Sequence, residues 1–159
     1  HLHRVVAAVA DDDAQFVSRS HGGVTITARG PTATVHEKEI EIRWRDLDPY
    51  GHVNHAVFLT YLEEVRDEWL SAAVGEDALG YVVARVEIDY RRELTQQDDR
   101  IVARIRLDSL GTSSVRTVEE LALTDGTLAA EAKAVLVACD EQHRPRPLAG
   151  EERDVLERA

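Results

Sequence analysis

The order of the hydrophobic patterns is the feature that most constrains the fold of this chain. A strand pattern at residues 39–45 comes first, one long helical pattern at about 55–73 follows, and four consecutive strand patterns occupy residues 82–139. A parallel α/β protein needs a regular alternation of strands and helices. The order here instead predicts an α+β fold, in which an antiparallel sheet wraps around one long helix. Because one helix covers one face of the sheet, we expect a second copy of the chain to cover the rest, in a homodimer.

The periodicity of the apolar residues predicts which faces are buried. In the first strand pattern, Ile40, Ile42 and Trp44 alternate with charged residues, which is typical of a half-buried strand. A second stripe of the helix is apolar except at Glu63 and Arg66, which we expect to pair with each other three residues apart. The main apolar face of the helix repeats at steps of four, three and four residues. This face consists of Phe58, Leu62, Val65 and Trp69.

Turn residues mark the ends of the expected elements. Asn54 is a suitable N-cap for the helix, and Gly75 follows its last turn. Asp125-Gly126 predicts a hairpin between the last two strands. The last pattern, TLAAEAKAVLVAC, is rich in alanine and also suits a helix, but its place after the hairpin and its VLVAC ending favour a strand. In the strand pattern VVARVEIDY we expect one face to carry Val82, Ala84, Val86, Ile88 and Tyr90.

Composition narrows the class of protein. The chain has 159 residues, 43% of them hydrophobic and 31% charged, which fits one globular domain. A net charge of -11 opposes binding to nucleic acid or to anionic membranes, and no apolar run approaches the roughly 20 residues of a membrane span. The single cysteine, Cys139, allows no disulfide within the chain and fits a reducing cytoplasm. We expect residues 1–37 to form a mobile arm, at most partly ordered, and residues 38–159 to form the folded domain.

The segment DLDPYGHVNH, at residues 46–55, carries more titratable groups than a plain turn needs. Asp48 precedes a proline, which disfavours helical backbone and keeps its side chain in the loop near the helix start. The helix N-terminus offers unpaired N–H groups and the positive end of the helix dipole, and Gly51 lets a ligand approach the backbone closely. Such a site can polarise a carbonyl while Asp48 attacks the carbon or activates a water molecule. A carboxylate suits a good leaving group such as a thiolate (thiol pKa about 8.5), so a thioester fits better than an amide.

Two other interpretations of this segment are open at the level of the residues. Asp, Asn, Pro and Gly are common in helix caps and turns, and Asp46 fits that role well. His52 and His55 flank the helix start and favour a functional site over a plain cap. A metal held by these histidines and Asp48 is conceivable, but no further Cys or acid lies close by in sequence, so we expect no metal. The chain also lacks a G-x-S-x-G motif and a phosphate-binding loop.

A longer stretch carries a family resemblance. RDLDPYGHVNHAVFLTYLEEVR resembles the D-x-D-x-x-G-H-V-N-N motif of hotdog-fold acyl-CoA thioesterases, in the branch that is similar to 4-hydroxybenzoyl-CoA thioesterase. The resemblance continues through RVEIDYRRELTQQDD, RLDSLGTSSV and AVLVACDEQHRPRPL and covers about residues 38–148. It implies a sheet wrapped around a long helix, assembly into homodimers or homotetramers, and hydrolysis of an acyl-CoA by water without a cofactor.

The same resemblance implies roles for individual residues. Asp48 falls on the family's catalytic aspartate, and the region of Gly51 supplies backbone donors to the thioester carbonyl. Some members carry a histidine at the position of His55, where it is implicated in catalysis, and many others carry Asn. In a sister branch a helix acid at the position of Glu63 is the catalytic carboxylate. Supporting roles therefore fall on His52, Asn54 and Glu63.

The resemblance also implies a coenzyme A site. The GTSS turn is expected near the pantetheine or nucleotide part, and arginines are expected near the phosphates. The expected contacts are Tyr50, Arg91, Arg92, Gly111, Thr112, Ser113, Ser114 and Arg144. Three alternatives stay open: a thioesterase for acyl or polyketide chains on a carrier protein, a non-catalytic acyl-CoA-binding module and, ranked last, a hotdog dehydratase. Aliphatic and aromatic acyl groups both fit the sequence.

Overall fold

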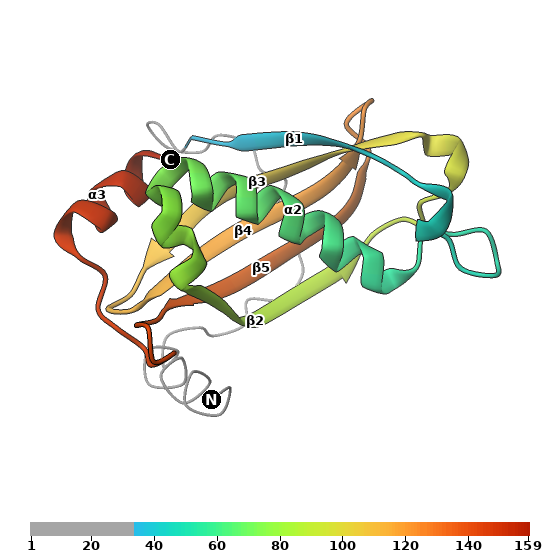
Figure 1. The fold of residues 1–159 in the computed structure, drawn as a ribbon. Coiled ribbons are helices and arrows are strands. Elements are labelled where there is room, and N and C mark those ends of the chain that lie inside the picture. Colours follow the sequence, from blue (N-terminus) through green and yellow to red (C-terminus); the bar gives the residue numbers. More distant parts are fainter. Residues whose placement is uncertain (1–33) are drawn as a thin grey trace.

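The computed structural model describes residues 34–159, and in this range a five-stranded antiparallel sheet curves around one long helix (Figure 1). The order of the strands in the sheet is β1-β3-β4-β5-β2, so the predicted α+β architecture is confirmed. The strands are β1 (His36–Glu41), β2 (Tyr81–Tyr90), β3 (Arg100–Leu110), β4 (Ser114–Leu123) and β5 (Leu128–Ala138). The helices are α2 (His55–Val74) and α3 (Gly150–Arg158), with short 3-10 turns η2 (Trp44–Asp46), η3 (Gly75–Gly80) and η4 (Gln96–Asp98).

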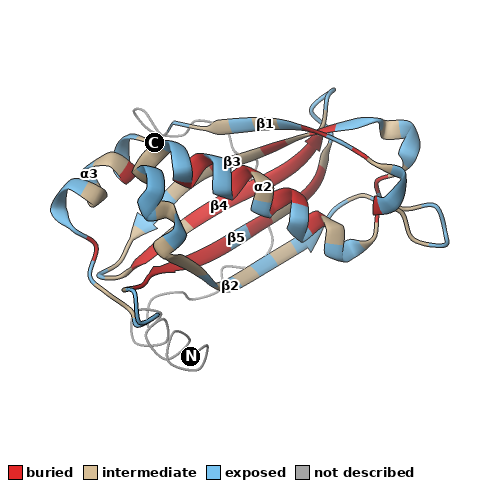
Figure 2. Ribbon diagram, in the orientation of Figure 1, coloured by how far each residue is buried: buried red, intermediate tan, exposed pale blue. Residues whose placement is uncertain are grey.

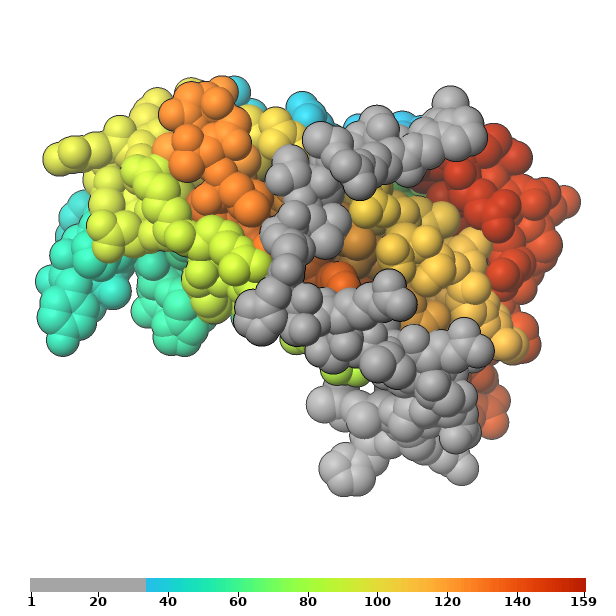
Figure 3. Space-filling view, turned by 180° about the vertical axis from the view of Figure 1, so that it is seen from behind, coloured from blue at the N-terminus to red at the C-terminus, as the bar shows by residue number. Residues whose placement is uncertain are grey.

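The topology gives the described part of the chain two distinct ends. One end contains the N-terminus of α2, the last residues of β2 and the hairpin between β4 and β5. The other contains the C-terminus of α2, the first residues of β2, the turn between β3 and β4, and α3. Figures 1 and 3 show the teal loop before α2 and the red helix α3 at opposite ends, from the front and from behind. We call these the α2-start end and the α3 end.

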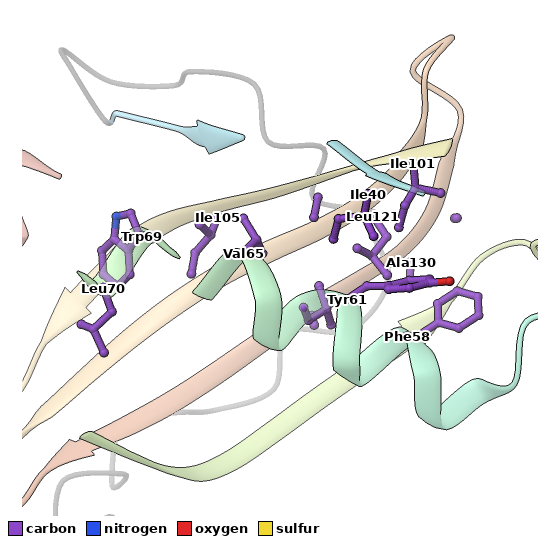
Figure 4. Packing of buried hydrophobic residues seen from close by; sticks show 14 of the residues in the cluster. Ile40, Phe58, Tyr61, Val65, Trp69, Leu70, Ile101, Ile105, Leu121 and Ala130 are labelled. Carbon is purple, nitrogen blue, oxygen red and sulfur yellow. The ribbon is translucent and has the colours of Figure 1, made fainter. Parts of the chain in front are cut away.

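The core lies between α2 and the concave face of the sheet. The four residues of the predicted apolar face of α2 are all at most 3% exposed, so that prediction is confirmed. Tyr61 belongs to the same face and is fully buried, and Figure 4 shows it beside Phe58 and below the strands. Figure 2 shows that β4 and β5 are mostly buried, whereas the edge strands β1 and β2 alternate between buried or intermediate and exposed residues. The strand interpretation of the alanine-rich segment is also confirmed, because alanines of β5 pack directly under α2.

The prediction for Trp44 was wrong. Ile40 and Ile42 are buried as expected, but the side chain of Trp44 is 83% exposed. β1 ends at Glu41, and the chain then enters the 3-10 turn η2. The carboxylate of Asp46 accepts the N–H of Arg43 at 2.8 Å, which closes this turn and ends the strand alternation. A 3-10 turn repeats every three residues instead of every two, so Trp44 leaves the core face.

The predicted single face of β2 is divided by a β-bulge. The register between β2 and β5 shifts between Val83 and Arg85. Val82 and Ala84 therefore pack in a separate cluster with residues of β5 that point away from α2, whereas Val86 and Ile88 pack into the main core. One inserted residue moves every later side chain of a strand to the opposite face. Periodicity alone does not reveal such an insertion.

The expected pair between Glu63 and Arg66 is not formed. Glu63 is exposed, whereas Arg66 is only 4% exposed and points toward the sheet. Its guanidinium donates to both carboxylate oxygens of Glu119 on β4, at 2.9 and 2.7 Å, and Thr117 donates to the same carboxylate at 2.7 Å. A buried guanidinium needs a buried counter-charge, and only a residue of the sheet lies within reach inside the core.

The predicted boundary between arm and domain falls inside β1. His36 and Glu37 belong to this strand, where His36 pairs with Ile105 and Glu37 binds Arg104 at 2.6 Å. Residues 1–33 of the predicted arm lie outside the described residues. Within the described range, no helix is both long and apolar enough to cross a membrane.

Candidate active site

Asp46 anchors the loop that leads into α2. Its side chain is 7% exposed, and its Oδ2 accepts a hydrogen bond from the hydroxyl of Tyr61 at 2.8 Å. Its backbone carbonyl accepts the N–H of Asn54 at 2.9 Å, so the two ends of the loop are joined. Burial, followed by the bond to Asp46, raises the pKa of Tyr61 above its usual range, which keeps the phenol protonated as a donor. Asp46 is therefore an anchor of the loop and does not cap α2.

Asp48 is held at the tip of this loop by backbone groups. Its Oδ1 accepts the N–H groups of Tyr50 at 2.9 Å and His52 at 3.2 Å. Its own N–H donates to the carbonyl of His52 at 2.7 Å, and its carbonyl accepts the N–H of Gly51 at 3.0 Å. Gly51 has φ +83°, a backbone conformation that side chains disfavour, and this explains the glycine. No hydrogen bond from residues 34–159 reaches Oδ2, which is the oxygen available for chemistry.

The start of α2 carries one uncommitted donor. The side chain of Asn54 accepts the N–H of Ala56 at 2.9 Å, so the predicted N-cap is confirmed. The N–H of Val57 binds the carbonyl of Asn54 at 2.8 Å. The N–H of Gly51 is already used in the turn, whereas the N–H of His55 donates to no acceptor in the described part of the chain. The positive end of the α2 dipole therefore lies at the free N–H of His55.

These groups open into a cleft with a volume of about 400 Å³, which is within the range of small-molecule sites. The loop at residues 46–54 and the start of α2 supply one side of it, and the last residue of β2 with the segment after it supplies the other. His52 is held by Glu93, with 3.4 Å between Nε2 and Oε2. The cleft is lined by Asp48, His52, Val53, His55, Phe58, Tyr90, Arg91, Arg92 and Glu93. A carboxylate, two imidazoles, an aromatic wall and two guanidinium groups thus meet at the start of one helix.

The family model of the Thioesterase-like superfamily matches residues 42–156. The chain belongs to this superfamily. The chain is therefore a thioester hydrolase, which is the class of enzyme that the sequence predicted. The match begins just before the loop at residues 46–54 and ends within α3, so it includes the whole cleft.

Individual relatives agree with the superfamily. The long-chain acyl-CoA thioesterase FadM of Escherichia coli is 28% identical over 131 residues, which is 76% of this chain and 96% of FadM. The chloroplastic acyl-acyl carrier protein thioesterase ATL3 of Arabidopsis thaliana is 27% identical over 119 residues, which is 69% of this chain and 61% of ATL3. A thioesterase of Thermus thermophilus, solved with coenzyme A and Zn, is 36% identical. Its TM-score is 0.70 over 76% of this chain and 90% of that chain, so the hotdog fold is confirmed.

Of the three arginines expected at coenzyme A phosphates, Arg91 and Arg92 are in the cleft, and both are paired. Arg91 binds Glu131 and Asp89. Arg92 binds Asp98 at 2.9 Å, and its buried Nη1 has no hydrogen-bond partner in the described part of the chain. A phosphate at either arginine would therefore have to replace a carboxylate partner.

The remaining residues expected at coenzyme A lie elsewhere. The turn Gly111 to Ser114 and Arg144 are at the α3 end, where the carbonyl of Gly111 accepts Arg153 at 2.7 Å and Arg144 binds Asp140 at 2.9 Å. β3 separates this end from the cleft by 11 residues, or roughly 35 Å at about 3.3 Å per residue. Within one chain, the structure therefore does not bring the GTSS turn to Asp48.

Two further expected residues make no contact with the cleft in this chain. The side chain of Tyr50 is 85% exposed, and only its N–H supports Asp48. Glu63 lies two turns into α2 on its exposed face. Among residues 34–159, no group of three or more His, Cys, Asp or Glu side chains is arranged to hold a metal ion.

The sequence analysis did not place Tyr90 in the cleft. Tyr90 was interpreted only as part of the apolar face of a strand. The signal for Tyr90 was its position as the last strand residue, directly before Arg91 and Arg92. The β-bulge in β2, which sends Tyr90 to the α2 side, was not visible in the pattern.

Proposed function

We propose that this chain is an acyl-CoA thioesterase that hydrolyses the thioester to a free acid and coenzyme A, with water as the second substrate and no cofactor. The observation that carries the proposal is the geometry of Asp48 at the open start of α2. One carboxylate oxygen is fixed by two backbone donors, and the other is free in the cleft. A fixed carboxylate with one free oxygen is suited to attack a carbonyl carbon or to take a proton from water.

The second part of the proposal concerns the carbonyl oxygen of the thioester. Negative charge develops on this oxygen as the carbon becomes tetrahedral, and a preorganised donor at that position lowers the barrier. The uncommitted N–H of His55, at the positive end of α2, is the donor that we assign. The N–H of Gly51 is already bonded to the carbonyl of Asp48 and is not available to the substrate. The contribution of Gly51 is its positive φ, which allows the turn that leads the chain into the helix.

The imidazoles and the leaving group complete the scheme. The side chain of His55 is exposed at the cleft and orients the attacking water or the carboxylate. His52 keeps the Asp48 turn closed through its backbone. The thiolate of coenzyme A leaves without a strong general acid, because a thiol has an ordinary pKa of about 8.5.

The active unit that we propose is a homodimer formed through β2. β2 is an edge strand, and Val83 and the nearby Leu59 of α2 are exposed hydrophobic residues. A two-fold axis that pairs β2 with its copy in the antiparallel sense brings the α3 end of one copy toward the cleft of the other. The GTSS turn and Arg144 of the second copy then approach the coenzyme A part of a substrate bound at Asp48.

A second candidate is hydrolysis of acyl groups on an acyl carrier protein. The likeness to ATL3, whose name gives this substrate, favours it. Both substrates present a thioester of the same chemical type, so the cleft chemistry is unchanged and the two differ in the surface beyond the thiol. Parallel assays with acyl-CoA and acyl carrier protein thioesters of the same acyl group distinguish them.

The test is thiol release from a panel of acyl-CoAs by the wild type and Asp48→Asn. Asn keeps an oxygen acceptor for the N–H groups of Tyr50 and His52 but removes the charge, so the loop keeps its shape. We expect at least a ~100-fold loss of kcat, the effect of a positioned acid–base group. The matched control is Asp67→Asn, a solvent-exposed acid on α2 outside the cleft, which should retain wild-type rates. Binding of acyl-CoA without release of thiol by the wild type would identify a binding module instead.

A further inference from the structure

Tyr90 connects the edge of the sheet to the start of α2. It is the last residue of β2, and its hydroxyl donates to the backbone carbonyl of His55 at 3.1 Å. His55 is the first residue of α2 and carries the uncommitted N–H. The hydrogen bond therefore fixes the width of the cleft at the position where that N–H is presented.

The ring of Tyr90 forms the exposed apolar surface of the cleft. It meets Phe58 edge to face, with 5.2 Å between ring centroids and 75° between planes. Phe58 is 3% exposed and Val53 5% exposed, whereas Tyr90 is 46% exposed. Among the cleft-lining residues of the described chain, Tyr90 is thus the apolar side chain that a ligand touches first.

The β-bulge explains why Tyr90 points here. Val82 and Ala84, before the bulge, lie on the face of β2 that points away from α2. Without the extra residue between Val83 and Arg85, the period of two would send Tyr90 to that same face. Bulges beside active sites redirect a side chain in this way. The bulge in β2 thus places the side chain of Tyr90 in the cleft.

We propose that Tyr90 is the specificity-determining residue of this site: its ring binds the first carbons of the acyl group, next to the thioester carbonyl, and its hydroxyl positions the helix start. The inference rests on the proposed acyl-CoA thioesterase function and extends it to the acyl side of the substrate. Acyl groups with an apolar chain or ring beside the carbonyl gain contact area on Tyr90, whereas an acetyl group has only a methyl to place there.

The experiment measures kcat and KM for hexanoyl-CoA and acetyl-CoA with the wild type, Tyr90→Ala and Tyr90→Phe. For Tyr90→Ala we expect the ratio of kcat/KM between hexanoyl-CoA and acetyl-CoA to fall at least ~10-fold, since the contact with the longer chain is lost. Tyr90→Phe keeps the ring, so this ratio should stay within about twofold of wild type while kcat falls for both substrates. A ratio of two substrates on one enzyme sample does not depend on the fraction of folded protein.

The matched control is Tyr81→Phe. Tyr81 is the first residue of the same strand, and its hydroxyl donates to Glu152, so this variant removes a comparable hydroxyl that lies at the α3 end. We expect it to leave the ratio unchanged, because the proposed dimer brings this end to the coenzyme A part, which both substrates share. An unchanged ratio in Tyr90→Ala, with Asp48→Asn inactive, would overturn the role of Tyr90 and leave the thioesterase function intact. If the wild type releases thiol from neither these acyl-CoAs nor any other in the panel, both proposals fail together.

Discussion

The two ends of β2 each carry a tyrosine whose hydroxyl reaches another element, but the surroundings of the two tyrosines differ. At the α3 end, Tyr81 donates to Glu152, which also accepts both terminal nitrogens of Arg146 at 2.8 Å and the N–H of Ala149 at 3.0 Å. At the α2-start end, Tyr90 donates to a backbone carbonyl beside an open cleft. One end is a closed network of charges, and the other leaves a carboxylate oxygen and an N–H without partners.

This difference separates stability from chemistry in the molecule. A carboxylate that accepts four hydrogen bonds has little left to offer a substrate, but it holds α3 to the sheet. A carboxylate with a free oxygen contributes less to stability and is available to react. The comparison therefore predicts that substitutions in the Glu152 network change unfolding without changing kcat, and that substitutions at the α2-start end lower kcat more than they change unfolding.

The largest effect on stability is expected midway between the two ends, at the buried pair of Arg66 and Glu119. Arg66→Met leaves Glu119 charged and without its guanidinium at 0% exposure, which costs about 3–5 kcal/mol. The loss should appear in urea unfolding as a lower midpoint with an unchanged slope. Because the pair lies under the centre of α2, this substitution should lower the stability of both ends of the molecule.

Two controls sharpen this prediction. Arg104→Met breaks the exposed pair between Arg104 and Glu37. The two side chains are 26% and 54% exposed, so the loss should cost less than about 1 kcal/mol. The double variant Arg66→Met with Glu119→Leu removes both buried charges and should recover much of the loss. If the double variant is as unstable as Arg66→Met, the cost comes from packing and not from the unpaired charge.

The next largest effect is a pH dependence at the α3 end. The Arg146 guanidinium, followed by the Tyr81 hydroxyl, lowers the pKa of Glu152 from its ordinary 4.5 to about 2. The folded state therefore binds the proton more weakly than the unfolded state. The corresponding stability is fully present above pH 4.5 and is lost as the pH falls from 4.5 toward 2, by an amount on the order of 3 kcal/mol.

Unfolding between pH 7 and pH 2 measures this contribution. Glu152→Gln should be less stable than wild type at pH 7 and should show a flatter decline below pH 4.5. Glu151→Gln, a neighbouring exposed acid in the first turn of α3, should follow the wild-type curve. The kcat at pH 7 per folded molecule should be the same in all three, since Glu152 binds Tyr81, Arg146 and Ala149 and is not among the expected contacts of the substrate. A parallel decline for Glu152→Gln and wild type would assign the acid sensitivity to other carboxylates.

Local sequence signals predicted the parts of the fold that depend on neighbours in sequence. The cap at Asn54, the helix end at Gly75 and the Asp125-Gly126 hairpin all follow from a few adjacent residues, and all are confirmed. The apolar face of α2, from Phe58 to Trp69, follows from a period of 3.6 over about three turns. These features required no knowledge of which strand lies next to which.

The parts that sequence did not predict depend on distant partners. Arg66 is 53 residues from Glu119, so the nearer Glu63 was the natural expectation. The bulge at Val83 depends on pairing with β5, and it is what places Tyr90 in the cleft. The position of Asp48 in the loop before α2 followed from its proline and from the helix after it, but the family resemblance did not reveal that the GTSS turn lies at the opposite end of the same chain.

A smaller effect is expected at the two glycines that flank α2. Gly51 precedes the helix at φ +83°, and Gly75 follows it at φ +63°, and a Cβ would meet no atom within 4 Å at either position. Substitution by alanine is therefore opposed by backbone conformation alone, at a cost of about 1–2 kcal/mol. Both Gly51→Ala and Gly75→Ala should lower the unfolding midpoint, and Gly75→Ala by at least as much, because its ψ of −133° lies outside the left-handed helical region.

Activity distinguishes these two variants, which both replace a glycine of positive φ but lie at opposite ends of α2. Gly51→Ala shifts the turn that presents Asp48 and should lower kcat by about tenfold or more, since small displacements of a catalytic group are costly. Gly75→Ala changes the far end of the helix and should retain wild-type kcat per folded molecule. Equal losses of kcat would mean that strain at either end of α2 is transmitted along the helix to the cleft. The two ends would then be coupled, and the division between a stabilising end and a reactive end would not hold.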